Sequence, residues 1–485
     1  MTIQMAPSSA NPEKPEKPEK PKKPEKSESR TAEDRLRYRS RADRLGVGNA
    51  LRERVPRQSH ERWSSSHAKS RDPIEILNQS NEGRVQELVP LRFGRMLRSP
   101  FTFFRGSAGL MAHDLAQLPS TQVHVQACGD CHLVNFGMFA TPERKLVFDI
   151  NDFDETLPAP WEWDVKRLAA SFVVAARDNK ISDAKARDIA TACVRSYREH
   201  LREYSRMSPL EVWYARMDVD YLIETAPDAA AKKRREAYAK AASGRILDNL
   251  FPKISAQVAG RPRLVDQPPV LFHVADEGLE ERVRQVLVMY RESLPDERRV
   301  LLDRYRLEDF AMKVVGIGSV GTRCWIALFF SEENHPLMLQ FKEACHSVLE
   351  PYVGKSVYEN QGQRIVVGQR LMQSSSDIFL GWVRGVQGYD YYVRQLRDMK
   401  FSIPMEDASA QAFERYAEIC GWVLARAHAK SGDSATISGY LGKSDNFDLA
   451  IGKFAVAYAD QTERDHAALT KAVRAGRVEV LEEEV

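Results

Sequence analysis

The chain has 485 residues, of which 43% are hydrophobic and 29% are charged, a composition typical of globular proteins. Its 71 Lys and Arg residues nearly balance its 68 Asp and Glu residues, which excludes a strong overall attraction to nucleic acid or to an anionic membrane. Six cysteines in so long a chain exclude a small fold held together by disulfides.

The first residues contain no basic region followed by an apolar run, which a secretory signal would need. The longest apolar stretch, residues 168–176, is too short to span a membrane. We therefore expect a cytoplasmic protein with no membrane partner. Residues 1–30 are predicted to form a disordered tail, because proline recurs through residues 11–26 and the intervening Lys and Glu bury nothing.

Residues 31–120 are predicted to form an Arg-rich helical segment. Arginine interleaved with phenylalanine, as in 92–105, can bind nucleic acid, form an anion pocket or simply pack. The near-neutral charge of the chain makes nucleic acid the least favoured of the three. The arginines concerned are Arg92, Arg95, Arg98 and Arg105.

The rest of the chain alternates between strand-like and helical patterns. Strands are predicted over 123–127, 135–140 and 145–151, and helices follow over 160–250 (with Ser182 as an N-cap) and 277–293. Five or six strands are predicted between 308 and 393, one of them over 363–373, with a short helix near 343–352. Helices return after 408, where one face would carry Phe413, Ala417, Cys420, Leu424 and His428.

The central motif, residues 128–135, reads Cys-Gly-Asp-Cys-His-Leu-Val-Asn and admits several interpretations. Cys-x-x-Cys-His is the attachment pattern for c-type haem, but that chemistry requires export. Cys-x-x-Cys can also be a redox pair, although such a pair usually opens a helix and the continuation here is strand-like. A structural zinc site would need a second pair of ligands, and the chain has no other Cys-x-x-Cys.

Another interpretation is that residues 129–135 resemble the catalytic loop of aminoglycoside-phosphotransferase-like kinases, which reads His-Gly-Asp-x-His-x-x-Asn. Asp130 and Asn135 keep the Asp-x-x-x-x-Asn spacing of kinase catalytic loops. Phosphoryl transfer needs a carboxylate to orient the acceptor hydroxyl and oxygen ligands to hold Mg²⁺. We therefore expect Asp130 and His132 to be catalytic and Asn135 to be a metal ligand.

A second metal carboxylate should follow the next strand. Asp152 and Asp154 follow the strand at 145–151, and Asp152 is preferred over Asp154 and Asp149. The resemblance supports this choice, because kinases of this type carry a further aspartate twelve residues after the metal aspartate, and Asp164 stands at that distance from Asp152.

Residues 316–321 read Gly-Ile-Gly-Ser-Val-Gly between two predicted strands. A strand–loop–strand context is typical of the kinase loop whose backbone amides cover the ATP phosphates. We expect Gly316, Gly318, Ser319 and Gly321 to contact ATP, and Lys342, on the following strand, to bind its phosphates and take part in catalysis. The acidic partner of Lys342 is predicted to be Glu350, with Glu343 less favoured.

Kinases carry the glycine-rich loop before the catalytic loop, whereas here the order is reversed. We therefore predict an α+β, protein-kinase-like two-lobed fold that is circularly permuted and has large helical additions. The catalytic loop and a helical lobe would occupy 121–300, the β-rich nucleotide-binding lobe 301–400, and helices completing the helical lobe 401–485.

The chain from about residue 30 to 475 also resembles the bacterial family called domain of unknown function 2252. The segments that carry this resemblance include RMLRSPFTFFRGSA, CGDCHLVNFGMFA, FDINDFDETLPAPWEWDVKRLAAS, GIGSVGTR and LQFKEACHSVLEPY. The resemblance implies a kinase-like assignment. Cys128 departs from the kinase pattern, since it replaces the histidine that supports the catalytic loop.

We expect a phosphotransferase that uses ATP and Mg²⁺ to modify a hydroxyl acceptor, which the sequence does not identify. Two alternatives remain open: a non-catalytic nucleotide-binding regulatory protein on the same fold, or a nucleotidyl (AMP) transferase. The oligomeric state is not predicted.

Overall fold

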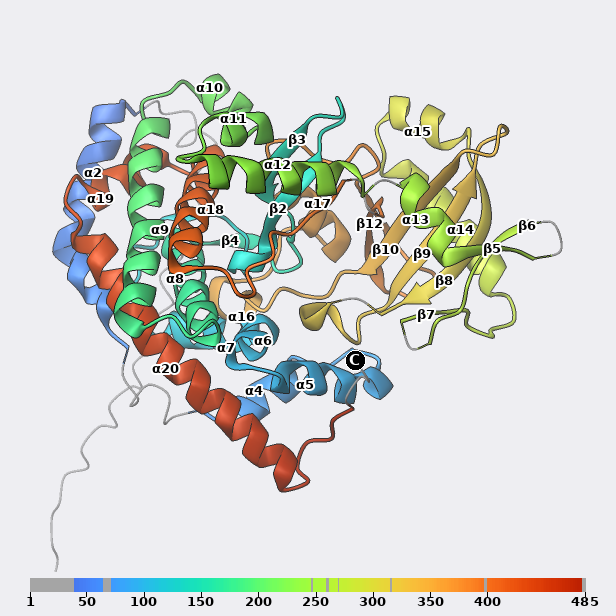
Figure 1. The fold of residues 1–485 in the computed structure, drawn as a ribbon, viewed down its shortest axis with the longest axis horizontal. Coiled ribbons are helices and arrows are strands. Elements are labelled where there is room, and N and C mark those ends of the chain that lie inside the picture. The colour runs from blue at the N-terminus through green and yellow to red at the C-terminus, as the bar shows by residue number, and fades with distance from the viewer. Residues whose placement is uncertain are drawn as a thin grey trace, which may run out of the picture. The chain divides into compact units, whose positions relative to one another are not determined.

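The computed structural model describes residues 39–63, 71–245, 247–258, 261–268, 270–314, 316–396 and 399–481. The predicted tail, residues 1–30, lies outside the described residues. From Arg41 onwards the chain forms one unit, in which most helices gather on one side and a six-stranded sheet lies on the other (Figure 1). None of the described helices is long and apolar enough to cross a bilayer.

The elements that precede the long helices are α2 (Arg41–Arg54), η1 (Arg57–Glu61), α4 (Pro73–Gln79), η2 (Gln86–Leu88), α5 (Val89–Leu97), α6 (Pro100–Gly106), α7 (Ala108–Ala116), β1 (His124–Ala127), η3 (Leu133–Asn135), β2 (Phe136–Ala140), β3 (Leu146–Ile150) and β4 (Leu157–Pro160). The middle of the chain forms α8 (Trp161–Asp178), α9 (Asp183–Tyr204), α10 (Pro209–Tyr214), α11 (Val219–Glu224), α12 (Ala229–Ser243), α13 (Leu247–Ile254), β5 (Ser255–Val258), β6 (Arg261–Leu264), β7 (Leu271–Phe272), α14 (Leu279–Glu292) and α15 (Asp296–Leu302). The remainder forms β8 (Arg306–Lys313), η4 (Ile317–Ser319), β9 (Cys324–Phe330), β10 (Pro336–Glu343), α16 (Glu350–Val353), α17 (Gln361–Met372), β11 (Gly381–Arg384), β12 (Asp390–Gln395), α18 (Ala410–Ser431), α19 (Ser434–Leu441) and α20 (Asn446–Arg474).

The helical side is built around α8, whose residues 161–176 are all buried, with α9, α18 and α20 packed in contact with it. Ser182 stands at the N-cap of α9 as predicted, although its side chain makes no capping hydrogen bond. The predicted apolar face of α18 is confirmed, because its members from Phe413 to His428 are all buried. These helices share one apolar core with the β2–β3 hairpin.

The large sheet is antiparallel and has the order β11-β12-β10-β9-β8-β7. Lys342 of β10 lies opposite Cys324 of β9 and Tyr392 of β12. Because successive strand side chains point to opposite faces, Phe341 faces an apolar cluster with α14 while Lys342 faces the other way. The sheet therefore has one apolar face and one face with polar groups.

Residues 363–373 were predicted as a strand, and this is wrong: they lie in helix α17. Buried positions Gly362, Ile365, Val366, Gln369 and Met372 have helical spacing, and the Asn360 side chain caps the helix by accepting from Gln363 N. Glycine at position 362 allows close packing of the helix, because a Cβ there would lie 2.2 Å from Tyr391 O.

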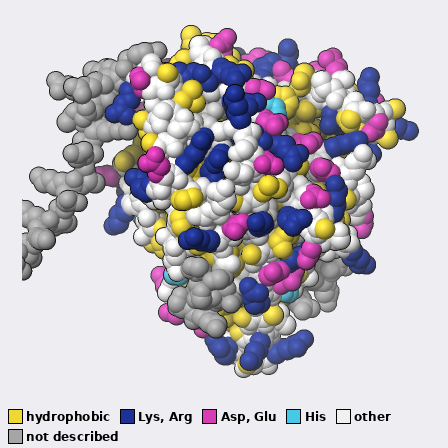
Figure 2. Space-filling view, turned by 90° about the vertical axis from the view of Figure 1, so that its left-hand side faces the viewer, with side chains coloured by type: hydrophobic (Ala, Val, Ile, Leu, Met, Phe, Trp, Pro, Cys, Tyr) yellow, Lys and Arg dark blue, Asp and Glu magenta, His cyan; other side chains and the backbone are white. Residues whose placement is uncertain are grey.

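The short helix predicted near 343–352 is limited to α16, because β10 continues to Glu343 and pairs there with Tyr391. Figure 2 shows the side of the molecule formed by the helices, where Lys and Arg side chains are interspersed with Asp and Glu.

Candidate active site

The central motif forms a tight turn between β1 and η3. The carboxylate of Asp164, in the first turn of α8, accepts the amides of Cys128 at 2.6 Å and Gly129 at 3.0 Å. Gly129 has φ +83°, and a Cβ there would lie 2.4 Å from Glu155 O, so glycine is required. The buried carboxylate of Asp164 therefore holds this turn against the start of α8.

Asp130 projects from the turn and remains one-fifth exposed. The guanidinium of Arg167, three residues after Asp164 on α8, donates through Nε to Asp130 Oδ1 at 2.7 Å. Asn135 donates its Nδ2 to Asp130 O at 2.6 Å, which orients the Asn135 amide within the turn. The structure thus brings the predicted base and the predicted metal amide together.

His132 is buried beside them. Its Nε2 lies 3.8 Å from Asp130 Oδ2, and its Nδ1 has no hydrogen-bond partner in the described part of the chain. Burial lowers the pKa of His132 to about 4, so the imidazole is neutral at physiological pH.

Three aspartates end the next strand, and they have different surroundings. Asp149 is held by Arg426 at 2.7 Å inside the core, which removes it as a metal candidate. Asp152 is half-buried, and its buried Oδ1 has no hydrogen-bond partner among the described residues. Burial raises the pKa of Asp152, but the cations Lys342 and Lys400 outweigh this and hold it below its usual value.

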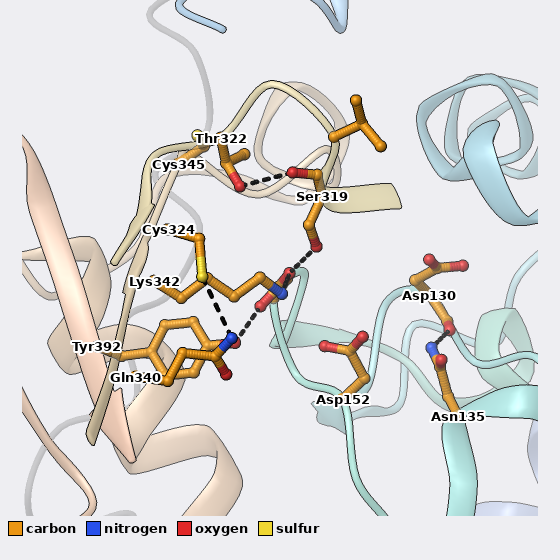
Figure 3. A network of polar contacts seen from close by, with 12 residues as sticks. Asp130, Asn135, Asp152, Ser319, Thr322, Cys324, Gln340, Lys342, Cys345 and Tyr392 are labelled. Carbon is orange, nitrogen blue, oxygen red and sulfur yellow. Dashed lines mark hydrogen bonds and ion pairs between the residues drawn. The ribbon is translucent and has the colours of Figure 1, made fainter. Parts of the chain in front are cut away.

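Asp154 joins the two sides of the molecule. Its carboxylate forms an ion pair with Lys342 and accepts from Tyr392 Oη at 2.8 Å and from Ser319 Oγ at 3.2 Å. Burial alone would lower the pKa of Lys342, but Asp154 and Tyr392 outweigh burial and raise it. Asp152 lies between Lys342 on one side and Asp130 and Asn135 on the other (Figure 3).

The glycine-rich loop connects β8 to β9. A Cβ at Gly316 would meet nothing within 4 Å, and one at Gly318 would meet only Arg105 O, at 3.7 Å, so the backbone on this side is open. Gly321 has a different role, because its φ of +86° closes the turn into β9. The loop is tied to the N-terminal segment through Val85 N to Gly321 O at 2.7 Å.

One cavity collects most of the predicted residues. It is lined by Arg105, Cys128, Asp130, His132, Asn135, Asp152, Asp154, Glu155, Gly316, Gly318, Ser319, Gln340, Lys342, Arg394 and Lys400. Two predicted residues, Gly321 and Glu350, do not line it. Glu350 instead accepts from His346 Nδ1 at 2.9 Å, and the acidic partner of Lys342 is Asp154. Glu343 points to the other face of β10, where it pairs with Arg323 at 3.2 Å.

The model of a bacterial protein family, described as uncharacterized proteins conserved in bacteria (DUF2252), matches residues 84–472. The chain belongs to this family. No curated protein and no solved structure shows significant similarity to the chain. The match covers every residue that lines the cavity.

The cavity of this DUF2252 protein contains cations that sequence reasoning missed. Arg394 follows Tyr392 by two residues on β12, so strand alternation could have placed it beside Lys342. Lys400 comes from the segment between β12 and α18, and no local pattern marks it. Arg105 was among the arginines considered for an anion pocket. Burial and the neighbouring Arg394 lower the pKa of Lys400 to about 7.

Only one of the four arginines in 92–105 reaches the cavity. Arg105 lines it, whereas Arg92 is buried in the helical segment and donates to Asn81 Oδ1 at 2.5 Å and Gly106 O at 2.6 Å. An anion pocket made by all four arginines is therefore not formed.

The two cysteines of the motif are free and buried. Burial raises the pKa of Cys131 to about 12, and a hydrogen bond with Cys131 together with burial raises that of Cys128, which makes both thiols poor nucleophiles. Cys128 Sγ lies 3.3 Å from Asp152 O. Cys128 therefore supports the turn of residues 152–155, called the acidic turn below. Within the described residues no three His, Cys, Asp or Glu side chains are arranged to hold a metal ion by themselves.

Proposed function

We propose that this protein is a kinase-like phosphotransferase that uses ATP and Mg²⁺ to phosphorylate a hydroxyl acceptor. The observation that carries the proposal is the single cavity lined by residues of the catalytic-loop motif, the acidic turn, the glycine-rich loop and Lys342. These segments lie more than 200 residues apart at the extremes and were selected from separate sequence patterns as parts of one reaction. If these acids only capped turns, the fold would not require them to line the same cavity as the glycine-rich loop.

The order of elements around the sheet supports the same proposal. The glycine-rich loop joins β8 and β9, the next strand β10 carries Lys342, and helix α17 follows before β11 and β12. Protein kinases have these parts in this order: loop, strand-borne lysine, helix. The catalytic-loop motif precedes them here, as a circular permutation requires.

The helical side of the cavity would supply the acid–base chemistry. In the proposed reaction the acceptor oxygen attacks the γ-phosphorus, the bond from that phosphorus to the oxygen of ADP breaks, and Asp130 takes the hydroxyl proton. Arg167 holds one oxygen of Asp130, and the other carboxylate oxygen faces His132 and the cavity.

The chemistry of the donor set fits Mg²⁺, which binds proteins through one or two carboxylates and completes its shell with water and phosphate oxygens. Asp152, with its unpartnered Oδ1, would be the first ligand, and Asn135 and Asp154 would complete the protein contribution. The ion would neutralise charge on the phosphates. Lys342, Arg394 and the amides around Gly316 and Gly318 would hold the phosphate chain.

The experiment is to measure binding and turnover of Mg-ATP in the full chain, with separate detection of ADP and pyrophosphate. Asp130→Asn should keep its ATP affinity and lose turnover by about 10²- to 10⁴-fold, the range for a general base. Asp152→Asn should weaken the Mg²⁺-dependent part of ATP binding. Asp220→Asn, which changes an exposed acid on α11, is the matched control and should change neither.

The products separate the alternatives. ADP release supports phosphoryl transfer, whereas pyrophosphate release with labelled AMP on an acceptor would assign nucleotidyl transfer. Saturable ATP binding without either product would assign a regulatory nucleotide-binding protein. Equal affinity and equal turnover in wild type, Asp130→Asn and Asp152→Asn would refute the proposal.

A further inference from the structure

Arg105 lines a cavity that is rich in acids. Its Nε is buried and has no hydrogen-bond partner, and it forms no ion pair with any acid in the described ranges. The other arginines near the catalytic-loop motif have partners for their terminal nitrogens or their charge: Arg167 binds Asp130, and Arg92 donates through Nη1 and Nη2 to Asn81 and Gly106 O, although the Arg92 Nε also lacks a partner among the described residues. Arg105 is half-buried, and a guanidinium that lines a cavity without an ion pair can bind an anionic group of a ligand.

Hydrogen bonds hold the backbone on both sides of Arg105, so the position of this residue is preorganised. Arg167 Nη2 donates to Phe104 O at 2.9 Å, and Arg92 Nη2 donates to Gly106 O at 2.6 Å. Both carbonyls flank Arg105, so two buried arginines hold its position at the end of α6. The same Arg167 holds Asp130, which couples the position of Arg105 to that of the proposed base.

The surroundings of Arg105 indicate which substrate it would bind. The negative charges that act on it are those of Asp130, Glu406 and Asp152, and of these Asp130 and Asp152 line the cavity. The phosphate end has its own cations, Lys342 and Arg394. Among the acids that act on Arg105, Asp130 has the largest effect, so an anion bound at Arg105 would lie beside the proposed base.

The segment that carries Arg105 is tied to both sides of the cavity. Residues 84–106 are tied to the glycine-rich loop by Arg84 Nη1 to Val320 O at 2.7 Å and to the helical side through Arg167. This segment therefore bridges both sides of the cavity, which favours a small molecule over a polypeptide.

We propose that Arg105 binds a carboxylate or phosphate group of the acceptor, so that the substrate is a small hydroxylated anion. This inference rests on the proposed phosphotransferase function. It narrows the acceptor class, since neutral sugars and protein hydroxyls would leave Arg105 unpaired.

The test uses inorganic phosphate as the probe for this second anion site. The full chain is first saturated with Mg²⁺ and a non-hydrolysable ATP analogue, and phosphate is then titrated by calorimetry. Wild type should bind phosphate saturably, and Arg105→Gln should bind it at least about tenfold more weakly, the effect of losing a charged hydrogen bond. Arg98→Gln, an exposed arginine between α5 and α6 that does not line the cavity, is the control and should match wild type.

Each other outcome has a distinct meaning. Equal phosphate binding in Arg105→Gln, or no phosphate binding in wild type that holds the analogue, would overturn the inference. Weaker analogue binding with unchanged phosphate binding in Arg105→Gln would also overturn it, by assigning Arg105 to the nucleotide. Failure of wild type to bind the analogue would instead overturn the proposed function. Thermal unfolding of each variant shows whether it is folded.

Discussion

The two sides of the cavity are held in different ways. On the helical side, Asp164 accepts two backbone amides of the motif and Arg167 holds Asp130, and both come from the buried helix α8. On the sheet side, the glycine-rich loop is held by hydrogen bonds within itself and by Arg84 and Val85. The backbone at Gly316 has open space where a side chain would be.

This difference matches what each side would do. A base must be fixed relative to the acceptor before the reaction, because a misplacement of about 1 Å costs roughly a hundredfold in rate. A loop that covers phosphates must instead admit and release a nucleotide. We therefore expect changes under the helical side to reduce stability and changes at the glycine-rich loop to reduce nucleotide affinity.

The largest effect on stability is expected from Asp164→Asn. The carboxylate also lies 3.2 Å from His428 Nε2 and is 1% exposed, so an amide in its place would present an N–H toward a buried donor. We expect the free energy of unfolding to fall by about 3 kcal/mol, the upper range for hydrogen bonds to a charged group. Urea unfolding measures this, with the exposed Asp188→Asn of α9 as the control.

An unchanged urea midpoint in Asp164→Asn would mean that the motif is not supported from α8. The two sides of the cavity would then not differ in how much they contribute to the free energy of unfolding.

His132 tests how strongly the helical side excludes water. Its pKa is lowered from an ordinary 6.5 to about 4 by burial. Below pH 6.5 His132 binds a proton in the unfolded chain, whereas in the folded protein it binds one only near pH 4 and below. The free energy of unfolding therefore decreases as the pH falls from 6.5 to 4. Between pH 7 and pH 5 this group alone should cost about 2 kcal/mol.

His132→Gln should remove that part of the pH dependence, as measured by urea unfolding at pH 7 and pH 5. His335→Gln, on an exposed turn, should leave the difference between the two pH values as in wild type. A wild-type slope that His132→Gln does not reduce would show that the imidazole is hydrated in the folded protein.

The contrast between the sides also explains what the sequence could predict. Short-range spacing determines the turn from Asp130 to Asn135 and the hairpin that leads to Asp152, so these residues were found together. Strand alternation placed Lys342 correctly on β10. Its acidic partner was not predicted, because Asp154 is 188 residues away and meets Lys342 only when the sheet packs against the acidic turn.

The same reasoning explains the error over 363–373. Short apolar runs with β-branched residues are compatible with strand and helix alike, and tertiary contacts decide between them. In this segment the contacts of Arg364 favour the helix, because its guanidinium donates to Thr156 O at 2.6 Å and to Asp154 O at 2.9 Å. These contacts between α17 and the acidic turn cannot be read from local periodicity.

The smallest effect on stability is expected from Arg84→Gln, which tests the sheet side. Arg84 donates to Val320 O and its side chain packs against Gly321, where a Cβ would lie 3.1 Å from it. Because the side chain is partly exposed, the free energy of unfolding should change by less than about 1 kcal/mol.

Loss of the hydrogen bond from Arg84 should leave the loop amides less ordered before binding, so the affinity for Mg-ATP should fall several-fold. Calorimetric titration with Mg-ATP measures this, and Arg98→Gln serves again as the control. A large loss of stability with unchanged nucleotide affinity would reverse the assignment, because the glycine-rich loop would then be part of the fixed framework and not the adaptable side of the cavity.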